Sequence, residues 1–286
     1  MWYPIQMKNI VPNGMNDHKS FLKWAGGKIK LLPKLRELGI EGGKRYIEPF
    51  VGSGVVALNM PHQEIIIGNT NEGLIDLWNG LATNGKSCLK DCIEVFKTSN
   101  TEDIYYNYRN VFNNTLHPHI KAYLFLYLNK HCFNGLCRFN SKGEFNVPYN
   151  HRKTPPTCPK KELLHAIEVC KRMTILKQGF EKTFDMVKKG DMVFNDPPYV
   201  PLSKTASFTS YTKDGFTLHD QEKLVELSKA AAKKGATVFI SNHDTPYTRE
   251  LYKDSTYMES INMARNISCK GNTRKSVKEL IVIYRP

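Results

Sequence analysis

The tetrapeptide Asp196-Pro197-Pro198-Tyr199 places a carboxylate, two rigid prolines and an aromatic ring just after a strand-like apolar run. Because proline has no N–H and a fixed φ, the carboxylate of Asp196 and the carbonyl of Pro197 form a stiff pair of hydrogen-bond acceptors. The ring of Tyr199 offers a flat face for stacking. This combination suits a planar ring with an exocyclic amino group, such as adenine or cytosine. The alternative is a plain turn at the end of a strand, since Asp and Pro are common turn residues.

A second candidate site is the glycine-rich loop 48–54, EPFVGSG. Its glycines let the backbone approach a ligand closely, but the spacing is not the G-x-x-x-x-G-K-[ST] pattern that cradles a nucleoside triphosphate. A nucleoside without phosphates therefore fits better. In such sites the residue that ends the second strand, here Asn69, usually holds the ribose hydroxyls. A purely structural turn is the other interpretation of this loop.

The segment 21–28, FLKWAGGK, combines an aromatic residue, a double glycine and two lysines. It could form a lip over a small ligand, with Trp24 packing on the ligand and Lys28 donating a hydrogen bond. It could equally be the start of a helix with a tryptophan in the core.

The elements that must position these motifs alternate between strands and helices. We expect strands over residues 45–48, 64–67, 191–194, 236–241 and 279–284, and helices over 28–38, from 55 onward, over 121–130 and over 217–234. Residues 72–158 are helical and basic in pattern, and residues 132–151, which are rich in Gly, Asn, Phe and Arg, resemble a hairpin or a loop. An α/β domain interrupted by an insertion accounts for this pattern.

The net charge of +14 over 286 residues points to a polyanionic partner, most simply nucleic acid. The alternative is a basic protein whose charge serves solubility. No apolar run reaches the length of a membrane span, and residues 1–20 look like a loose leader without the apolar stretch of a signal peptide. The seven cysteines form no CxxC pair, so we expect structural thiols in a reduced, cytoplasmic protein and no metal site.

Taken together, these segments resemble the S-adenosylmethionine-dependent DNA adenine methyltransferases of the Dam-like group. The resemblance runs from about residue 21 to residue 286. It includes the stretches FLKWAGGK, EPFVGSG, FNGLCRFNSKGEFNVP, DPPYVPLS, FTSYT, FISNHDT and GNTRK. It implies a Rossmann-like methyltransferase domain with a mixed sheet, formed by residues 21–71 and 160–286. A mainly helical target-recognition insertion with a hairpin would occupy residues 72–159.

The resemblance also implies roles for single residues. S-adenosylmethionine is the implied cofactor, and its pocket is assigned to Trp24, Lys28, Phe50, Gly52, Gly54, Asn69 and Asp196. The catalytic unit is the tetrapeptide, in which Asp196 is the catalytic acid, lying near the methionine amino group, and Tyr199 stacks on the target adenine. The implied partner is double-stranded DNA, bound by a monomer.

The implied DNA contacts are Lys23, Phe133, Asn134, Leu136, Arg138, Asn140, Asn146, Pro148, Arg152 and Lys153. Phe133 would insert into the base stack, and Asn134 would support the orphaned partner base. Lys23, Leu136, Arg138 and Pro148 would contact bases, and the other four would contact phosphates. These assignments imply the target G-A-T-C, which agrees with chemistry, because arginine suits the paired acceptors of guanine and apolar side chains suit the thymine methyl.

A mechanism follows from these roles. The amino nitrogen of adenine is a poor nucleophile because its lone pair is delocalised into the ring. If Asp196 and the Pro197 carbonyl accept hydrogen bonds from its two N–H groups, the lone pair becomes localised on nitrogen. The nitrogen can then attack the sulfonium methyl group in line. Positioning and electrostatics would supply most of the acceleration. An adenine inside a duplex must first be flipped out of the stack.

The chain departs from the family pattern at two places. Position 69, usually acidic, holds Asn69, so we expect weaker binding of the ribose hydroxyls. Asn150 and His151 stand where a small residue and an arginine are usual, which could remove a phosphate contact. Two rival functions remain: methylation of RNA adenine or of a protein glutamine, and DNA binding by a catalytically inactive relative. The intact acid at Asp196 argues against both.

Overall fold

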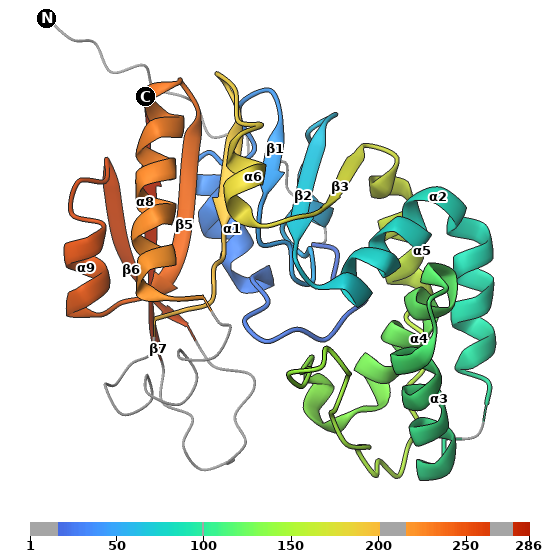
Figure 1. Ribbon diagram of the computed structural model, residues 1–286. Coiled ribbons are helices and arrows are strands. Elements are labelled where there is room, and N and C mark those ends of the chain that lie inside the picture. The colour runs from blue at the N-terminus through green and yellow to red at the C-terminus, as the bar shows by residue number, and fades with distance from the viewer. Residues whose placement is uncertain (1–16, 99, 201–215, 264–276) are drawn as a thin grey trace, which may run out of the picture.

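The computed structural model describes residues 17–98, 100–200, 216–263 and 277–286 (Figure 1). The leader expected over residues 1–20 therefore lies almost wholly outside the described residues. The stretches FTSYT and GNTRK and the last three residues of DPPYVPLS also lie outside them.

A seven-stranded mixed sheet forms the centre of the fold, in the order β3-β2-β1-β4-β5-β7-β6. The strands are β1 (Tyr46–Glu48), β2 (Ile65–Asn69), β3 (Met173–Lys177), β4 (Met192–Asn195), β5 (Thr237–His243), β6 (Tyr257–Met263) and β7 (Val277–Tyr284). Strands β1 to β5 are parallel, and β7 runs antiparallel to both β5 and β6. The five expected strands are all present, and the predicted α/β fold with a Rossmann-like mixed sheet is confirmed.

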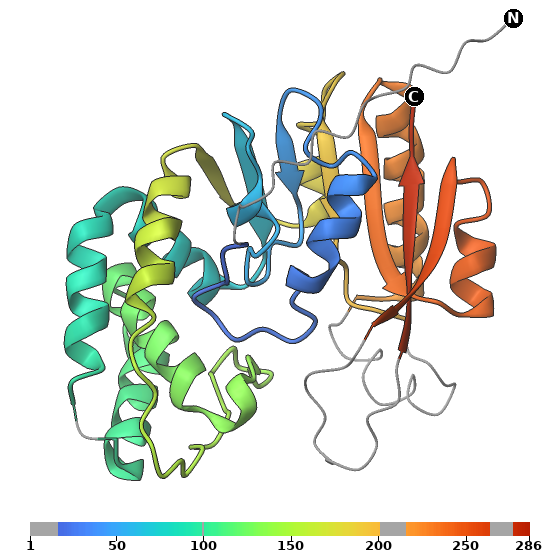
Figure 2. The same cartoon turned by 180° about the vertical axis from the view of Figure 1, so that it is seen from behind.

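Helices cover both faces of the sheet, because alternate residues of each strand point to opposite sides. Ile47 and Val193 pack under α6 (Phe180–Phe184) and α8 (Leu218–Lys233), in front of the sheet in Figure 1. The other face packs against η1 (Ile29–Leu31) with α1 (Leu32–Glu37), and against α2 (Glu72–Val95) and α5 (Lys160–Cys170). Figure 2 shows α1 in front of that face. A short helix, α9 (Pro246–Leu251), lies near the edge strand β6.

Local signals explain where the helices begin and end. Thr217 caps α8 in a reciprocal capping box with Asp220, and Gly235 follows its end with a φ of 97°. Pro33 lies in the first turn of α1, where a missing N–H costs least. Both arrangements agree with the expected helices over residues 217–234 and 28–38.

The helix expected from Val55 onward is wrong. The structure has a single 3-10 turn there, η2 (Ala57–Asn59). Gly52 and Gly54 adopt positive φ angles of 46° and 64°, which turn the chain sharply before the helix can begin. Pro61 then holds the preceding Met60 in an extended conformation and ends the turn.

Between β2 and β3 the chain leaves the sheet and forms a set of helices, called here the helical insertion. It contains α2, α3 (Glu102–Asn114) and α4 (Pro118–His131), followed by the 3-10 turn η3 (Phe133–Gly135). The segment expected as a hairpin or loop over residues 132–151 is a loop closed by two isolated antiparallel bridges, Cys132–Tyr149 and Phe139–Phe145. The expected helix over residues 121–130 is confirmed within the longer α4.

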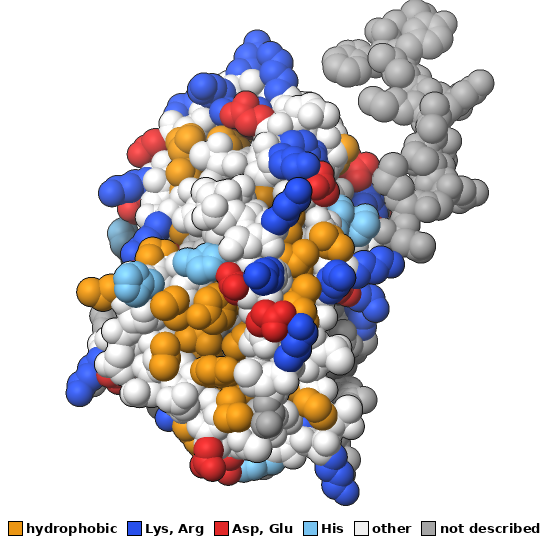
Figure 3. Space-filling view, turned by 90° about the vertical axis from the view of Figure 1, so that its right-hand side faces the viewer, with side chains coloured by type: hydrophobic (Ala, Val, Ile, Leu, Met, Phe, Trp, Pro, Cys, Tyr) orange, Lys and Arg blue, Asp and Glu red, His pale blue; other side chains and the backbone are white. Residues whose placement is uncertain are grey.

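One outer face of the helical insertion carries charges of both signs. Figure 3 shows lysine and arginine side chains interspersed with acidic ones, around hydrophobic side chains that gather across the middle. The net charge of +14 is therefore not expressed as a uniform basic field on this face. In the part of the chain that the structure describes, no helix is long and apolar enough to cross a bilayer.

Candidate active site

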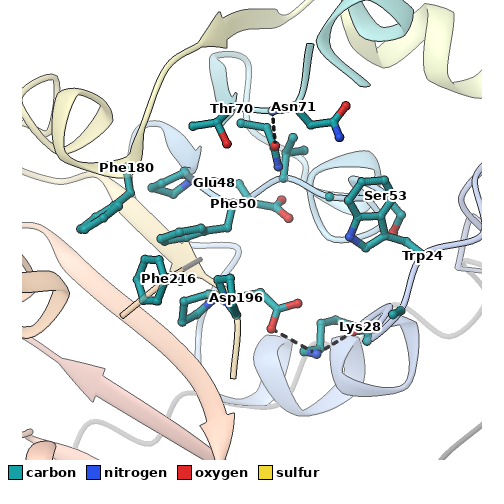
Figure 4. A pocket seen from close by; sticks show the side chains of 18 of the residues that line it. Trp24, Lys28, Glu48, Phe50, Ser53, Thr70, Asn71, Phe180, Asp196 and Phe216 are labelled. Atoms are coloured by element: carbon teal, nitrogen blue, oxygen red, sulfur yellow. Dashed lines mark hydrogen bonds and ion pairs between the residues drawn. The ribbon is translucent and has the colours of Figure 1, made fainter. Parts of the chain in front are cut away.

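A cavity of about 740 Å³ opens where the strand order reverses, between β1 and β4 (Figure 4). In open parallel sheets this point gathers the loops that follow neighbouring strands on opposite sides, so it is the usual place for a ligand. The cavity is lined by residues 24–28 of the lip, the glycine loop after β1, the turn after β2 and the tetrapeptide after β4. All the expected catalytic and cofactor residues line it except Gly54.

The two glycines of the loop have different neighbours. A Cβ added at Gly52 would lie 2.8 Å from Nε1 of Trp24, so the indole ring of the lip rests directly on the glycine loop. A Cβ added at Gly54 would lie 2.4 Å from the buried ring of Trp78 on α2. Gly52 therefore lets the lip close over the cavity, whereas Gly54 lets α2 pack against the loop from behind.

Asp196 presents its carboxylate to the cavity with 22% of the side chain exposed. Ser241 Oγ, on β5, donates a hydrogen bond of 2.9 Å to Asp196 Oδ1, and Nζ of Lys28 lies 3.1 Å from the same oxygen. Oδ2 has no hydrogen-bond partner among the described residues, so an acceptor remains for a ligand. Burial raises the pKa of Asp196 above its ordinary value, although the charge of Lys28 and the Ser241 hydrogen bond act in the opposite direction.

Lys28 is a buried cation shared between two carboxylates. Its Nζ lies 3.2 Å from Glu279 Oε1 in addition to the Asp196 contact, and it donates a hydrogen bond of 2.6 Å to the Gly26 carbonyl. Burial acts to lower the pKa of Lys28, but the charges of Asp196 and Glu279 outweigh it, and the pKa is raised. The ammonium also lies 4.7 Å from the centre of the Tyr199 ring, within cation–π range.

Glu279 on β7 is a site residue that the sequence motifs did not identify. The Tyr199 hydroxyl donates a hydrogen bond to its carboxylate, which fixes the orientation of the tyrosine ring. His243 packs edge-on against that ring, with 4.8 Å between the ring centres. The available signal was an acid that begins an otherwise apolar run, Glu279 to Tyr284, since a charge on a buried strand needs a partner.

Three phenylalanines form an aromatic wall on another side of the cavity. Phe50 stacks on Phe180 with 5.4 Å between ring centres, and Phe216 meets both rings at 5.4–5.5 Å (Figure 4). Phe180 begins α6 and Phe216 precedes α8, so the wall joins three segments that are distant in the sequence. Of these rings, the sequence analysis identified that of Phe50 alone, because no short motif connects the other two to the glycine loop.

Glu48, at the end of β1, is a second carboxyl group of the cavity and is almost fully buried. Its Oε2 accepts hydrogen bonds from the Tyr46 hydroxyl (2.9 Å) and from the Ala57 N–H (3.0 Å). Burial raises the pKa of Glu48 to about 8, and the nearby charge of Asp196 adds to this, while the two hydrogen bonds act to lower it. A cationic ligand in the cavity would favour the ionised form.

The raised pKa of Glu48 predicts that Glu48→Gln stabilises the protein more at pH 8 than at pH 5. Between the ordinary value of 4.5 and about 8, the folded wild type holds a proton that the unfolded chain has released, so its free energy of unfolding falls as pH rises. Glutamine does not titrate, so the free energy of unfolding of Glu48→Gln does not fall for this reason. We expect its advantage in the free energy of unfolding, measured by urea denaturation, to grow by about 3–4 kcal/mol from pH 5 to pH 8.

The matched control for this measurement is Glu226→Gln, which neutralises a carboxylate that is 69% exposed on α8. Its difference from the wild type should stay nearly constant over the same pH range. A constant difference for Glu48→Gln as well would show that the buried carboxyl titrates normally.

Asn69 ends β2 and lines the cavity, as the glycine-loop pattern predicted for the second strand. Its Oδ1 already accepts a hydrogen bond of 2.9 Å from the backbone N–H of Asn71, which in turn caps the start of α2. An amide has one acceptor oxygen with two lone pairs, so only one lone pair remains for the two ribose hydroxyls, and it carries no full charge. Its NH₂ group offers two donors instead.

The residues expected to contact DNA surround the loop that contains η3, beside the cavity. Phe133 is 43% exposed, as an inserting ring must be, and Asn134 adopts a left-handed φ of 54°. The Arg138 guanidinium is held from one side by Asn146, through Nε to Oδ1 at 2.7 Å and NH2 to the backbone carbonyl at 3.2 Å. Asn146, expected as a phosphate contact, therefore also orients an expected base contact.

The other expected DNA contacts differ in their surroundings. Asn140 donates to Glu144 within the loop, and the Pro148 carbonyl accepts the Phe133 N–H at 2.8 Å. The Lys23 ammonium is buried and has no hydrogen-bond partner among the described residues. Burial lowers its pKa, and the charge of Arg152 adds to this effect. Leu136 packs partly buried against the core, and Arg152 and Lys153 are exposed.

Metal ligands and disulfides are not features of the described residues. Within them, no group of three or more His, Cys, Asp or Glu side chains could hold a metal ion. Six cysteines in this part of the chain are free thiols.

Sequence comparisons with known proteins agree on one family. Residues 24–267 match the family described as D12 class N6 adenine-specific DNA methyltransferase. The chain is 38% identical over 273 residues to the DNA adenine methylase of Escherichia coli (strain K12), covering 95% of this chain and 97% of the relative. It is 39% identical over 270 residues to the DNA adenine methylase of Haemophilus influenzae, covering 93% of this chain and 94% of the relative.

Proposed function

Because the chain belongs to the D12 class N6 adenine-specific DNA methyltransferase family, we propose that it methylates adenine N6 in duplex DNA at the sequence G-A-T-C, with S-adenosylmethionine as the methyl donor. Membership of the family makes it an adenine-specific DNA methyltransferase that uses a methyl donor and acts on DNA. The observation that best supports the finer proposal is the Asp196 carboxylate. It is rigidly held and still has an acceptor oxygen at a cavity large enough for a nucleoside.

The chemical groups that line the cavity suit S-adenosylmethionine. The Phe50–Phe180–Phe216 wall offers flat apolar surface for an adenine ring. The carboxyl groups of Glu48 and Asp196 suit a ligand that carries an ammonium and a sulfonium charge, and Gly52 lets the backbone come close. When bound, this cofactor supplies an electrophilic methyl group.

The tetrapeptide and its partners would handle the adenine amino group. Asp196 Oδ2 and the Pro197 carbonyl would accept hydrogen bonds from its two N–H groups. These hydrogen bonds localise the lone pair on nitrogen and prepare the nitrogen as the nucleophile. Ser241 and Lys28 hold the other oxygen of Asp196, so the carboxylate is oriented before substrate arrives. Glu279 holds the hydroxyl of Tyr199, which keeps that ring ready to stack on the base.

The loop around η3 would read the sequence. We propose that an extruded adenine leaves a gap that the exposed Phe133 ring fills, because a base inside a duplex cannot reach Asp196. The Arg138 guanidinium, held by Asn146 along one side only, is the group we assign to guanine. Lys23, buried without a hydrogen-bond partner among the described residues, would gain an acceptor from a base edge.

The substitution Asn69→Asp should tighten cofactor binding about tenfold, since charge-assisted hydrogen bonds to ribose hydroxyls contribute about 1–2 kcal/mol. One carboxylate oxygen can keep the Asn71 N–H while the second becomes available to the ligand. The dissociation constant of S-adenosylhomocysteine, measured by titration calorimetry, checks this. Asn110→Asp, at an exposed position on α3, is the control and should change nothing. Equal affinities of Asn69→Asp and the wild type would refute the argument.

The function is tested on unmethylated plasmid DNA. Incubation with the protein and S-adenosylmethionine should make every G-A-T-C resistant to a nuclease that methylation blocks and sensitive to one that requires methylation. Sites that differ by one base pair should stay unmodified. Methylated adenine spread over unrelated sequences would contradict the proposed target, and absence of N6-methyladenine would contradict the proposed activity.

A further inference from the structure

Asn129, near the end of α4, joins the lip of the cavity to the loop around η3. Its Oδ1 accepts the Lys23 N–H at 2.9 Å and its Nδ2 donates to the Lys23 carbonyl at 2.8 Å, across 106 residues of sequence. Nδ2 also lies 3.3 Å from the Gly135 carbonyl and 3.4 Å from Cys137 Sγ. An amide NH₂ has two hydrogens, so it can hold both segments at once. The Asn129 side chain is fully buried, which makes these bonds costly to break.

The hydrogen bonds between Asn129 and the Lys23 backbone, called here the Asn129 clamp, lie one peptide bond away from a residue that lines the cavity. Lys23 is followed by Trp24, whose indole rests on Gly52 and lines the cavity. A shift of the Lys23 backbone would therefore move part of the cavity wall. The Lys23 side chain, expected to contact a base, is fixed at its root by the same two hydrogen bonds.

On the side of the loop, the contact is equally close. Gly135 has a φ of 67°, and a Cβ added there would lie 2.5 Å from Lys23 Cβ, so the loop rests directly on the lip. Gly135 is next to Leu136, and Cys137 lines the cavity from the helical insertion. The loop around η3 and the cavity thus have a common boundary, which is held in place by the hydrogen bonds of Asn129.

We propose that Asn129 is a positioning residue that couples base recognition by residues 133–138 to the cofactor cavity. The inference rests on the proposed function. Docking of the loop on its cognate bases would fix Gly135 and, through the Asn129 amide, hold Lys23 and Trp24 in the arrangement that closes the cavity. Because such coupling is reciprocal, cognate DNA should tighten the cofactor by the same factor by which the cofactor tightens cognate DNA.

The chain offers a matched control in Asn113 on α3. Its Oδ1 accepts the Phe145 N–H at 2.8 Å and its Nδ2 donates to the Phe145 carbonyl at 3.2 Å. This is the same two-bond clamp on a backbone, but both partners lie within the helical insertion. Asn113→Ala therefore reports the cost of losing such a clamp without touching the lip.

The experiment measures the dissociation constant of S-adenosylhomocysteine alone, with a saturating G-A-T-C duplex, and with a duplex in which one base pair is changed. In the wild type and in Asn113→Ala, the cognate duplex should tighten this ligand about tenfold more than the altered one does. In Asn129→Ala the two duplexes should have nearly equal effects. In Gly135→Ala the added methyl group would push the loop away from Lys23, so this variant should behave in the same way. It replaces Asn129→Ala in the experiment if that variant does not fold.

The outcomes separate this inference from the proposed function. If Asn129→Ala or Gly135→Ala keeps the cognate preference of the wild type, or if Asn113→Ala loses it to the same extent, Asn129 is structural only. If the wild type methylates G-A-T-C but shows no difference between the duplexes in cofactor binding, the coupling is absent while the function stands. If the wild type methylates no adenine, the proposed function itself fails.

Discussion

Replacement of Asp196 by alanine should lower methyl transfer by about 10³-fold or more, in the range seen when one preorganised hydrogen-bonding group is removed from an active site. The variant loses the acceptor assigned to the adenine amino group and leaves the Lys28 ammonium, still paired with Glu279, facing the cavity. Single-turnover incorporation of labelled methyl groups into a G-A-T-C duplex measures the loss.

DNA binding by Asp196→Ala should survive, because the expected contacts to phosphates and to the other bases lie around the η3 loop and on Lys23, and the Tyr199 ring is unchanged. Fluorescence anisotropy with a labelled duplex checks this point. Asp254→Ala, which removes a carboxylate that is 59% exposed and paired with Lys229, is the control and should turn over normally. Turnover of Asp196→Ala within a few-fold of the wild type would remove the basis of the proposed mechanism.

Replacement of Arg138 by alanine should relax sequence choice at one base pair, lowering discrimination by about 10- to 100-fold, since a bidentate contact to guanine contributes about 1–3 kcal/mol. The guanidinium is exposed and is held by Asn146 rather than by a salt bridge, so its loss should not unfold the loop. The ratio of kcat/KM for G-A-T-C to kcat/KM for a duplex with one altered pair gives the discrimination.

Lys153→Ala separates recognition from general attraction. An exposed lysine that contacts phosphate should weaken binding to both duplexes by a similar factor and make binding less dependent on salt. If Arg138→Ala behaved like Lys153→Ala, with equal losses on both duplexes, Arg138 would be a backbone contact and not a reader of bases.

The parts of the site that the sequence predicted are those carried by short segments. The acid of the tetrapeptide and the glycine loop each follow a strand, and Asn69 is the last residue of one. Topology alone brings the ends of parallel neighbours together. The prediction of a helix after the glycine loop was wrong. It relied on the apolar run from Val55, although the proline at position 61 already indicated that a helix could not continue past Met60.

The parts that the sequence analysis missed depend on long-range packing. Glu279 reaches Lys28 because β7 inserts next to β5, and Phe180 reaches Phe50 because α6 covers β1 and β2. No spacing rule connects residues that far apart. Asn129 was overlooked for a related reason: within an apolar helix an asparagine looks like a tolerated exception, until the backbone that its amide holds is known.

The position of the helical insertion has a consequence for how the molecule assembles. Strands β2 and β3 are neighbours, and Ile65 pairs with Met173, yet all of α2 to α5 lies between them in the chain. Closure of so long an unstructured loop is entropically unfavourable and slow. A Cβ added at Gly85 on α2 would lie 2.7 Å from Ile167 on α5, so packing of these helices draws the two strands together. We therefore expect the helical insertion, together with α5, to acquire its structure first and to act as the folding nucleus for that edge of the sheet.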